Sequence, residues 1–307
     1  MGLRKGGAGA VQAVASRSLS KAEEFAAVEF IPDVYGSYQE LVDADNIDLV
    51  YNPLPNSLHA EWTIKCLKAG KPVLCEKPFT VTAAEAREVA AVSQDTGVPA
   101  VEAFMYRHHP QYEEARSLLD SGAIGPLHSL RLQFSHRLED RSIVQADPAL
   151  GGGVLMDLGC YCVNAARLLT RMEPTRVLGW EYRTNIDDTF VGILEFPGPL
   201  VAQFEASFLT APRVGIELLG TKGRINIRRP WHSREAAEQL HLRTAEGTTV
   251  VGCAGDDCFR MEAADLAQAW SQKRGPRWGV DDAVKNMTIL ESLYLSAREA
   301  RAVSLSP

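Results

Sequence analysis

The chain has 307 residues, of which 46% are hydrophobic, and a formal net charge of -7 at pH 7. This is enough material for one large domain or two ordinary ones with an apolar core. The acidic balance gives no electrostatic reason to expect a nucleic-acid partner, because a phosphate backbone selects clustered Lys and Arg. The longest apolar runs are too short to span a bilayer and the first residues lack a secretory signal, so we expect a cytoplasmic protein with no membrane partner.

Short apolar runs alternate with helical stretches in the first hundred residues, which is typical of βαβ units and a parallel sheet. The predicted strands lie at residues 11–15, 48–52, 72–75 and 99–103. They predict an α/β fold with a Rossmann-type, doubly wound sheet, in a dinucleotide-binding domain at residues 1–105.

Helix start and stop signals separate these strands. Ser20, Ser37 and Thr82 each precede a glutamate by three residues, which is the spacing of a capping box. A further helix follows Asn56 and ends at Gly70, because glycine readily takes the left-handed conformation that ends helices. These signals agree with the parallel-sheet pattern.

Longer alternating strands follow after about residue 105 and predict a mostly antiparallel sheet. They lie at residues 127–136, 190–196, 200–208 and 214–227, with turn residues at 198–199 and 220–223. We predict a second, α+β domain at residues 106–307, which binds substrate and mediates oligomerisation. Its open sheet face predicts a homodimer or homotetramer.

Six cysteines are scattered at positions 66, 75, 160, 162, 253 and 258. Their spacings do not match common zinc sites, and no histidine pair stands near them at ligand spacing. We predict buried, reduced thiols and no metal site, because unpaired cysteine is among the most buried residue types.

Two motifs carry the candidate chemistry. Glu76-Lys77-Pro78 follows the apolar run 72–75, so Lys77 is expected at the end of a buried strand, where open α/β sheets bind ligands. The stretch 151–161 holds three consecutive glycines, then Asp157 and Tyr161. If residues 157–169 form a helix, Asp157 and Tyr161 share one face and can both point at Lys77. The alternative for Tyr161 is a half-buried aromatic residue on a helix.

Three segments in this order resemble the family of glucose-fructose oxidoreductases, inositol dehydrogenases and MocA-type oxidoreductases. They are residues 53–59, residues 69–78, and the triple glycine with Asp157 and Tyr161. The resemblance spans nearly the whole chain. A tyrosine at position 161 is similar to the branch of xylose dehydrogenases and dihydrodiol dehydrogenases.

The resemblance implies an oxidoreductase that transfers a hydride between NADP and a sugar, a cyclic polyol or a vicinal diol. In the implied mechanism Tyr161 removes a hydroxyl proton, and Lys77 lowers the pKa of Tyr161 and orients the substrate. Asp157 orients the sugar hydroxyl or the tyrosine. We expect burial and a positive nicotinamide ring nearby to lower the pKa of Lys77 towards neutrality.

The end of the first predicted strand favours NADP over NAD as the cofactor. NAD enzymes usually place a carboxylate there, whereas this chain has Ser16 and Arg17, with Lys21 one helical turn later. An arginine–phosphate hydrogen bond is worth roughly 1.5–3 kcal/mol, enough to favour NADP by about tenfold or more. The alternative is an exposed turn with a solvated arginine.

By resemblance, Lys77 and five further residues are expected at the cofactor: Leu54, Asn56, His59, Glu76 and Arg107. Asn56 and His59 would lie under the nicotinamide ribose, Leu54 against the ring, and Arg107 at the domain junction. Alternatively, Asn56 simply begins a helix that carries His59 on its first turn.

The N-terminus departs from the family pattern. A dinucleotide-binding domain should open with a buried strand, a G-x-G-x-x-G turn and a helix that holds the pyrophosphate. Gly7-Ala8-Gly9 is followed by a strand-like run, and by resemblance residues 2–10 are only the tail of the first helix. Roughly 20–30 residues would then be missing. Either the protein begins upstream, which we expect, or a natural variant has lost the phosphate cradle.

A milder departure lies before Asp147, where relatives often carry Asn-Ile-Arg-Leu and residues 143–146 here contain no arginine. A guanidinium near the substrate entrance is therefore expected to be absent. Other functions stay open beside the enzyme: a non-catalytic regulator that senses a nucleotide or sugar, an inactive fragment, or an enzyme that recycles a tightly bound cofactor between two substrates.

Overall fold

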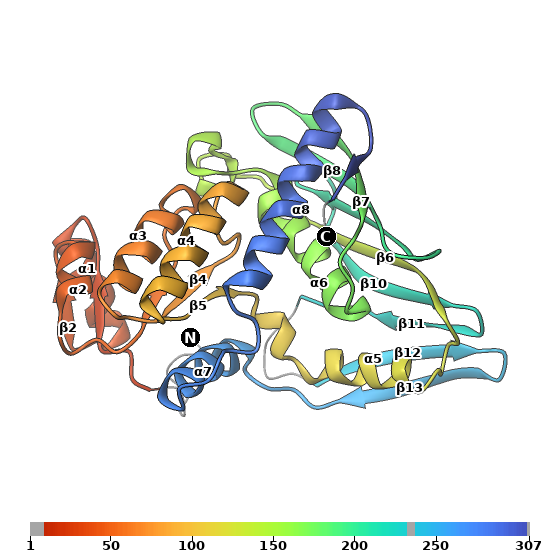
Figure 1. Ribbon diagram of the computed structural model, residues 1–307, viewed down its shortest axis with the longest axis horizontal. Coiled ribbons are helices and arrows are strands. Elements are labelled where there is room, and N and C mark those ends of the chain that lie inside the picture. Colours follow the sequence, from red (N-terminus) through yellow and green to blue (C-terminus); the bar gives the residue numbers. More distant parts are fainter. Residues whose placement is uncertain (1–8, 232–236, 306–307) are drawn as a thin grey trace.

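Short parallel strands build the N-terminal third, as the sequence predicts (Figure 1). The computed structural model describes residues 9–231 and 237–305. The strands are β1 (Ala13–Ala15), β2 (Asp33–Tyr35), β3 (Val50–Asn52), β4 (Val73–Glu76) and β5 (Ala100–Ala103). β1 pairs with β2, and β4 lies between β3 and β5. Within the described residues no ladder joins β1 to β3, so the parallel strands form two separate sheets.

Helices connect these strands: α1 (Leu19–Glu29), α2 (Tyr38–Asp43), α3 (Asn56–Lys68) and α4 (Ala83–Thr96). Thr82 and Glu85 form the predicted capping box of α4. Gly70 follows α3 with a φ of +76°, which confirms the predicted glycine stop.

The other two predicted capping boxes differ from the structure. Ser37 accepts from the Glu40 amide, but the Glu40 carboxylate accepts from the amide of Gly36 instead of Ser37. The box predicted at Ser20 is wrong, because α1 begins directly after Ser18 and Ser20 lies inside the helix. The predicted helix tail at residues 2–10 lies mostly outside the described residues, and its last two residues, 9 and 10, are not helical.

The second half of the chain forms a 9-stranded sheet within the described residues, drawn mostly in green to light blue in Figure 1. Its strands are β6 (Leu127–Ser135), β7 (Arg176–Arg183), β8 (Asp187–Glu195), β9 (Val201–Ser207), β10 (Arg213–Gly220), β11 (Gly223–Ile227), β12 (Glu238–Thr244), β13 (Gly247–Cys253) and β14 (Val303–Ser304). The order is β13-β12-β11-β10-β6-β9-β8-β7-β14. All neighbours are antiparallel except β6 and β9, which confirms the predicted sheet type.

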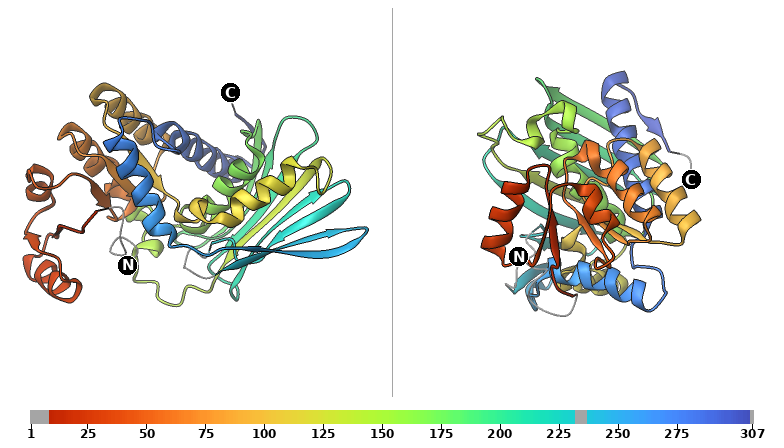
Figure 2. Two further views of the ribbon diagram at one scale, coloured as in Figure 1. Left: turned by 90° about the horizontal axis from the view of Figure 1, so that it is seen from below. Right: turned by 90° about the vertical axis from the view of Figure 1, so that its left-hand side faces the viewer.

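Some of the remaining helices cover one face of this sheet, and the others join it to the parallel strands. They are α5 (Pro110–Asp120), α6 (Cys160–Thr170), α7 (Cys258–Ser271) and α8 (Val280–Glu299), with short helical turns η2 (Met105–His108), η3 (Val144–Ala146), η4 (Pro148–Leu150) and the π-helix η5 (Leu155–Gly159). α8 contacts both α4 and β7. Figure 2 shows α1 and α2, in red, at one end of the molecule and the large sheet at the other.

α7 returns to the parallel sheet although it belongs to the second half of the chain. Its residues Ala263 and Leu266 pack on Leu74, Val101 and Ala103 of β4 and β5. The region predicted as a second domain therefore covers one face of the first. The division near residue 105 stays a prediction.

The segment Pro148–Thr170 is long and apolar enough to cross a membrane by length and composition alone, with a mean hydropathy of 1.2. This corrects the expectation that every apolar run is too short. In this fold 78% of the apolar window is buried inside the protein, as in a core helix. The six cysteines, two of them in this segment, are free and buried, which confirms the prediction of reduced thiols.

Candidate active site

Lys77 and Asp157 meet where β4 ends. β4 is buried up to Cys75 and ends with Glu76, so Lys77 is the first residue beyond the strand. The Lys77 Nζ donates to Asp157 Oδ1 at 2.7 Å and to the Asp157 carbonyl at 2.8 Å. Both side chains are largely buried, with relative exposures of 14% and 17%. The two sequence motifs, which lie 80 residues apart, therefore form one site.

The triple glycine makes this approach possible. Gly151 has a φ of +79°, and a Cβ there would lie 3.0 Å from the Cβ of Asn56, whose Nδ2 donates to the Gly151 carbonyl at 2.8 Å. Gly153 has a φ of +133°, and its Cβ would lie 2.1 Å from Asp187 Oδ1. At both positions a side chain would be strained by the positive φ and would clash with its neighbours, so both require glycine. The loop leads into the π-helix η5, a geometry frequent at functional sites, which carries Asp157.

Tyr161 lies in the first turn of α6, beside Lys77. The helix predicted from Asp157 onwards is η5 followed by α6, and both Asp157 and Tyr161 still face Lys77. The Lys77 Nζ lies 5.1 Å from the centroid of the Tyr161 ring. The phenol hydroxyl donates to Met105 Sδ at 3.6 Å, which is a weak acceptor. The sequence prediction that these three residues come together agrees with this geometry.

Aromatic rings enclose Tyr161. They belong to Phe104, Tyr106, Phe134 and Trp231, with centroid distances of 5.2, 5.7, 5.4 and 5.7 Å. The side chain is only 6% exposed. This environment excludes water from the ring and fixes the position of the ring.

The pKa values of this group follow from burial and charge. Burial disfavours the ammonium of Lys77, but Asp157 and other nearby groups outweigh it and raise the pKa of Lys77 well above its usual value. With only protein groups around it, Lys77 therefore has a raised pKa, and the expectation that its pKa is lowered is wrong. Burial raises the pKa of Tyr161, and the charge of Lys77 opposes this only in part. At neutral pH Lys77 is an ammonium and Tyr161 a phenol.

Glu76 forms a second polar pair at the same sheet end. It accepts from Tyr51 OH at 2.6 Å and, through its other oxygen, from the Lys77 amide at 3.2 Å. Glu262 of α7 is buried nearby, and burial, then the charge of Glu76, raises its pKa well above the usual value. Tyr51 and Glu262 escape sequence-based prediction. Tyr51 could have been found, because it lies near the carboxyl end of β3, the strand beside β4.

Asn56 and His59 hold backbone segments around Lys77. His59 is fully buried, with Nδ1 2.8 Å from the Pro78 carbonyl and Nε2 2.6 Å from the Leu54 carbonyl. Burial lowers the pKa of His59. Asn56 begins α3 and fastens Gly151, as described above, and Leu54 is half-buried. Both polar residues position the site, and their contact with a cofactor stays a prediction.

Ser16, Arg17 and Lys21 cluster at the turn between β1 and α1. Ser16 directly follows β1 and accepts from the Ser18 amide at 3.2 Å, and Lys21 lies in the first turn of α1. Arg17 and Lys21 are exposed, and the first turn of α1 holds no acidic residue. Two cations beside hydroxyl groups fit the 2′-phosphate of NADP in their chemistry.

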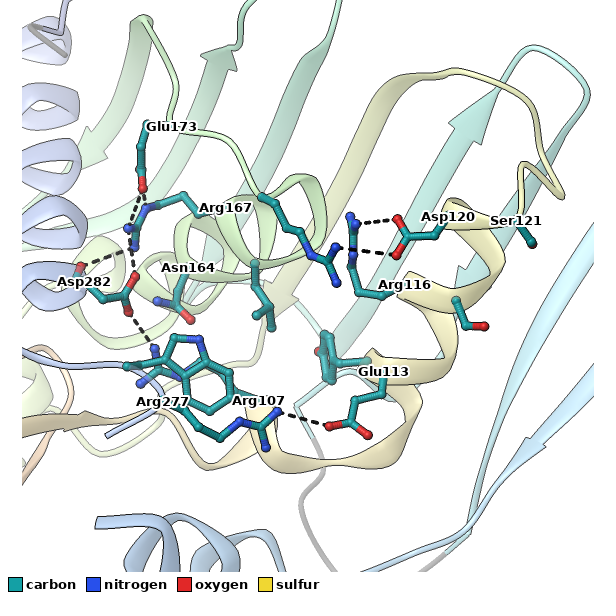
Figure 3. A pocket seen from close by; sticks show the side chains of 15 residues that line it. Arg107, Glu113, Arg116, Asp120, Ser121, Asn164, Arg167, Glu173, Arg277 and Asp282 are labelled. Carbon is teal, nitrogen blue, oxygen red and sulfur yellow. Dashed lines mark hydrogen bonds and ion pairs between the residues drawn. The ribbon is translucent and has the colours of Figure 1, made fainter. Parts of the chain in front are cut away.

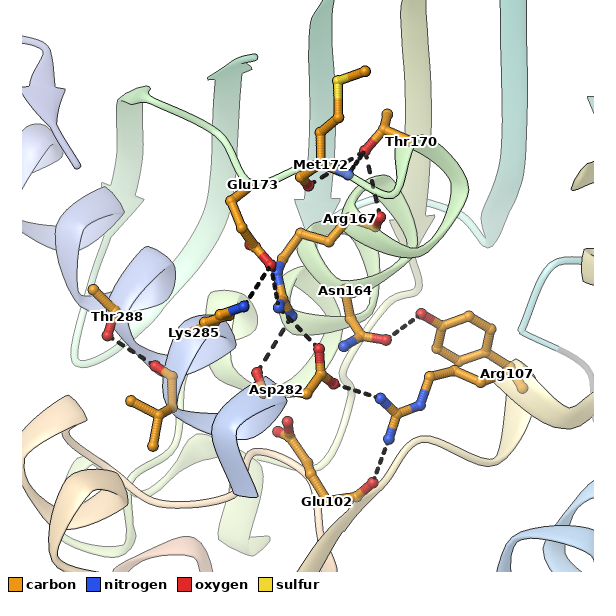
Figure 4. Close-up of polar contacts among 12 residues, drawn as sticks. Glu102, Arg107, Asn164, Arg167, Thr170, Met172, Glu173, Asp282, Lys285 and Thr288 are labelled. Atoms are coloured by element: carbon orange, nitrogen blue, oxygen red, sulfur yellow. Dashed lines mark hydrogen bonds and ion pairs between the residues drawn. The ribbon is translucent and has the colours of Figure 1, made fainter. Parts of the chain in front are cut away.

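Arg107 lies in a buried ion network (Figure 4). Its Nη1 donates to Asp282 Oδ2 at 2.7 Å and its Nη2 to the Glu102 carbonyl at 2.7 Å. Arg167 pairs with the same Asp282 at 2.8 Å and with Glu173 at 2.7 Å. Arg107 thus joins β5 to α8, at the junction of the two halves of the chain as predicted, and its place beside the cofactor stays a prediction.

The loop before η4 lacks an arginine at residues 143–146, but it carries Arg141. Residues 143–146 contain no arginine and include η3. Arg141, two residues earlier, pairs with the buried Asp188. Asp188 follows Asp187, the residue that faces Gly153. Because consecutive strand residues point to opposite faces of a sheet, this pairing does not by itself bring Arg141 to the glycine loop.

Comparison with known proteins finds relatives for both halves of the chain. Residues 3–104 match the oxidoreductase family with an NAD-binding Rossmann fold, and residues 112–226 match the GFO/IDH/MocA C-terminal domain. The chain is 36% identical to D-xylose 1-dehydrogenase (NADP(+)) 2 of Haloferax volcanii, over 95% of this chain and 91% of that protein. It is 37% identical to trans-1,2-dihydrobenzene-1,2-diol dehydrogenase of Xenopus laevis, over 71% of this chain and 66% of that protein.

Solved structures agree with these relatives. Aldose-aldose oxidoreductase from Caulobacter crescentus, complexed with glycerol, matches with a TM-score of 0.89 and 27% identity over 96% of this chain and 91% of that one. KijD10, a 3-ketoreductase from Actinomadura kijaniata in complex with NADP and TDP-benzene, matches with a TM-score of 0.88 and 27% identity over 93% and 89%. Variants of KijD10 substitute a lysine and a tyrosine separated by the same number of residues as Lys77 and Tyr161.

Proposed function

Because this chain belongs to the GFO/IDH/MocA family of oxidoreductases, we propose that it is an NADP-dependent dehydrogenase or reductase acting on a sugar, a cyclic polyol or a vicinal diol. The meeting of Lys77, Asp157 and Tyr161 at the end of β4 carries this proposal. Two similar enzymes are named for D-xylose with NADP and for a dihydrobenzene diol, which supports the substrate class.

Tyr161 is the proton-transfer residue in this proposal. A bound nicotinamide cofactor would supply the hydride chemistry. In reduction, the Tyr161 hydroxyl gives its proton to the carbonyl oxygen of the substrate, which leaves a phenolate. In oxidation, the Tyr161 phenolate takes the proton of the substrate hydroxyl as the C–H bond breaks. Among the described residues its hydroxyl bonds only the weak acceptor Met105, so the O–H can turn towards a substrate oxygen.

Lys77 and Asp157 support this proton transfer electrostatically. Asp157 holds the Lys77 ammonium in place with two hydrogen bonds. The positive charge stabilises the Tyr161 phenolate and the negative charge that develops on the substrate oxygen. Asp157 thus acts through Lys77 as a positioning residue.

The cofactor is proposed to lie along the carboxyl ends of the parallel strands. Ser16, Arg17 and Lys21 would hold the 2′-phosphate, as their donor chemistry suggests. Leu54, Asn56 and Glu76 lie beside Lys77, where the nicotinamide end would have to be. His59 and Arg107 would act only through the backbone segments that they hold.

The test is cofactor reduction with a panel of aldoses, cyclic polyols and diols. Lys77→Ala should lower turnover by about 10²–10⁴-fold and leave NADP binding intact, because it removes a charge needed mainly in the transition state. Lys68→Ala, an exposed lysine in the last turn of α3, is the matched control and should keep full activity. Equal turnover in both variants would contradict the proposed role. Tight NADP binding without turnover on any substrate would favour the sensing regulator.

We also propose a cytoplasmic homo-oligomer. All six cysteines are free thiols, as is usual in a reducing compartment. One face of β7 carries three exposed apolar side chains, Leu178, Trp180 and Tyr182, with exposures of 41%, 57% and 50%. Val191 of the neighbouring strand β8 stands opposite Trp180. A row of exposed apolar side chains on an open sheet supports a second copy of this chain as the partner.

A further inference from the structure

A cavity of about 880 Å³ lies between α5, α6 and the segment before α8 (Figure 3). Asn164 and Arg107 line it, whereas Lys77 and Tyr161 do not. Its volume lies in the range of small-ligand sites. It is separate from the group proposed for catalysis and has no part in the proposed reaction.

Arginine dominates the walls of this cavity. The guanidinium groups belong to Arg107, Arg116, Arg167, Arg171 and Arg277, and the carboxylates to Glu113, Asp120, Glu173 and Asp282. Every one of these carboxylates already pairs with one or two of these arginines. The acidic groups are therefore engaged, and one positive charge is in excess.

Some donors in the walls have no acceptor. The Nε atoms of Arg107 and Arg116 are buried and lack a hydrogen-bond partner within the described residues. Because these two atoms are not accessible, a ligand in the cavity does not reach them, and the donors open to a ligand lie at the rim. At the rim, Arg171 is 65% exposed and approaches Asp120 only at 3.6 Å. The Arg277 guanidinium pairs with Glu113 at 3.1 Å and lies over the Trp278 ring at 4.8 Å, with no second carboxylate partner among the described residues. These guanidinium groups have N–H donors to spare for a ligand.

We propose that this cavity binds a small phosphorylated molecule through Arg116, Arg171 and Arg277. A terminal phosphate presents three oxygens, one for each guanidinium, whereas a carboxylate presents only two. Guanidinium groups match phosphate geometry with paired N–H bonds. The remaining volume leaves room for the rest of a molecule of the size of a sugar phosphate.

The cavity wall is shared with the elements that hold Tyr161. Tyr161 and Asn164 lie on successive turns of α6. Tyr106 donates to Asn164 Oδ1 at 2.6 Å and packs against the ring of Tyr161 at 5.7 Å. An occupant would therefore touch the support of Tyr161, but its binding does not depend on the proposed reaction.

Isothermal calorimetry of the full chain with pyrophosphate tests the proposal, with and without NADP. We expect one site per chain that persists when NADP is present. The double variant Arg171→Gln with Arg277→Gln should weaken binding by at least about tenfold, because it removes two of three charge-assisted contacts. Both side chains are exposed, so the fold should be retained. The double variant Arg213→Gln with Arg228→Gln removes the same two charges at exposed positions outside the cavity and should bind like the wild type.

Three results would overturn the proposal. One is the absence of any pyrophosphate binding at millimolar concentration. Another is equal weakening by Arg213→Gln with Arg228→Gln, which would show a general charge effect. The third is binding that NADP abolishes and the double variant leaves unchanged, which would assign pyrophosphate to the cofactor site. Citrate, which has carboxylates and no phosphate, should bind more weakly, and equal affinity would contradict the choice of phosphate.

Discussion

The charge on Lys77 governs what Tyr161 can do. Asp157 keeps Lys77 an ammonium, and burial keeps Tyr161 a phenol. Reduction of a carbonyl needs the phenol as a proton donor, whereas oxidation of a hydroxyl needs the phenolate. In the proposed reaction the resting site is therefore set for reduction at neutral pH.

The oxidation rate should consequently rise with pH. Below the raised pKa of Tyr161, the phenolate fraction grows about tenfold per pH unit, so kcat for oxidation should climb from about pH 7 to about pH 9 without a plateau. A pH–rate profile at saturating substrate measures this. Tyr161→Phe should flatten and lower the profile, and Tyr182→Phe, an exposed tyrosine, should leave it unchanged. A plateau near pH 7 would contradict the assignment.

Glu102 should make the free energy of unfolding depend on pH. Its Oε1 accepts from the Phe79 amide at 2.9 Å, just beyond the Lys77 turn, and its Oε2 has no partner within the described residues. Burial, opposed by Arg107, raises the pKa of Glu102 from 4.5 to about 8. A raised pKa in the folded state means that stability falls as pH rises from about 4.5 to about 8.

Glu102→Gln should remove this loss, because the amide oxygen still accepts from Phe79 and never ionises. Urea unfolding at pH 5 and pH 8 measures it: the variant should lose less stability between the two pH values than the wild type does. Glu88→Gln, an exposed residue of α4, is the control and should follow the wild type. An unchanged pH slope in Glu102→Gln would contradict the raised pKa.

Among the secondary-structure elements, the capping box predicted at Thr82 is present and the one predicted at Ser20 is not, so the two positions should differ in stability. Thr82→Ala should lower the free energy of unfolding by about 1 kcal/mol, because it removes the observed capping box of α4. Ser20→Ala should change it by less than about 0.5 kcal/mol, because Ser20 caps nothing. Thermal or urea unfolding of the pair measures both. A larger loss for Ser20→Ala than for Thr82→Ala would reverse this assignment.

Elements with strong local signals could be predicted from the sequence, and those that depend on distant partners could not. β4, β5, the α4 cap and the Gly70 stop rest on nearby residues. β2 is three half-buried residues without an apolar run, so its pattern is weak. The direction of Arg107 depends on Asp282, 175 residues later, and no local pattern encodes it. Lys77, Asp157 and Tyr161 were predictable together because each belongs to a motif with its own spacing.

At the scale of the whole molecule, the proposed dimer surface is the open face of the large sheet around Trp180. Trp180→Glu should convert an oligomer into a monomer in light scattering at micromolar concentration, because it places a charge in the centre of an apolar contact. Trp270→Glu, an exposed tryptophan of α7, is the matched control and should leave the assembly unchanged. A wild-type monomer would contradict the proposed assembly.

The packing of α7 on β4 and β5 has a consequence for how the protein is made. During translation the parallel strands leave the ribosome first, and Leu74 and Val101 then lack their cover until the large sheet has been synthesised and α7 follows. An apolar strand face left open for that time invites association with other nascent chains or with a chaperone. Chains that stop before residue 258 should therefore be captured by chaperones or precipitate, even though every parallel strand is complete.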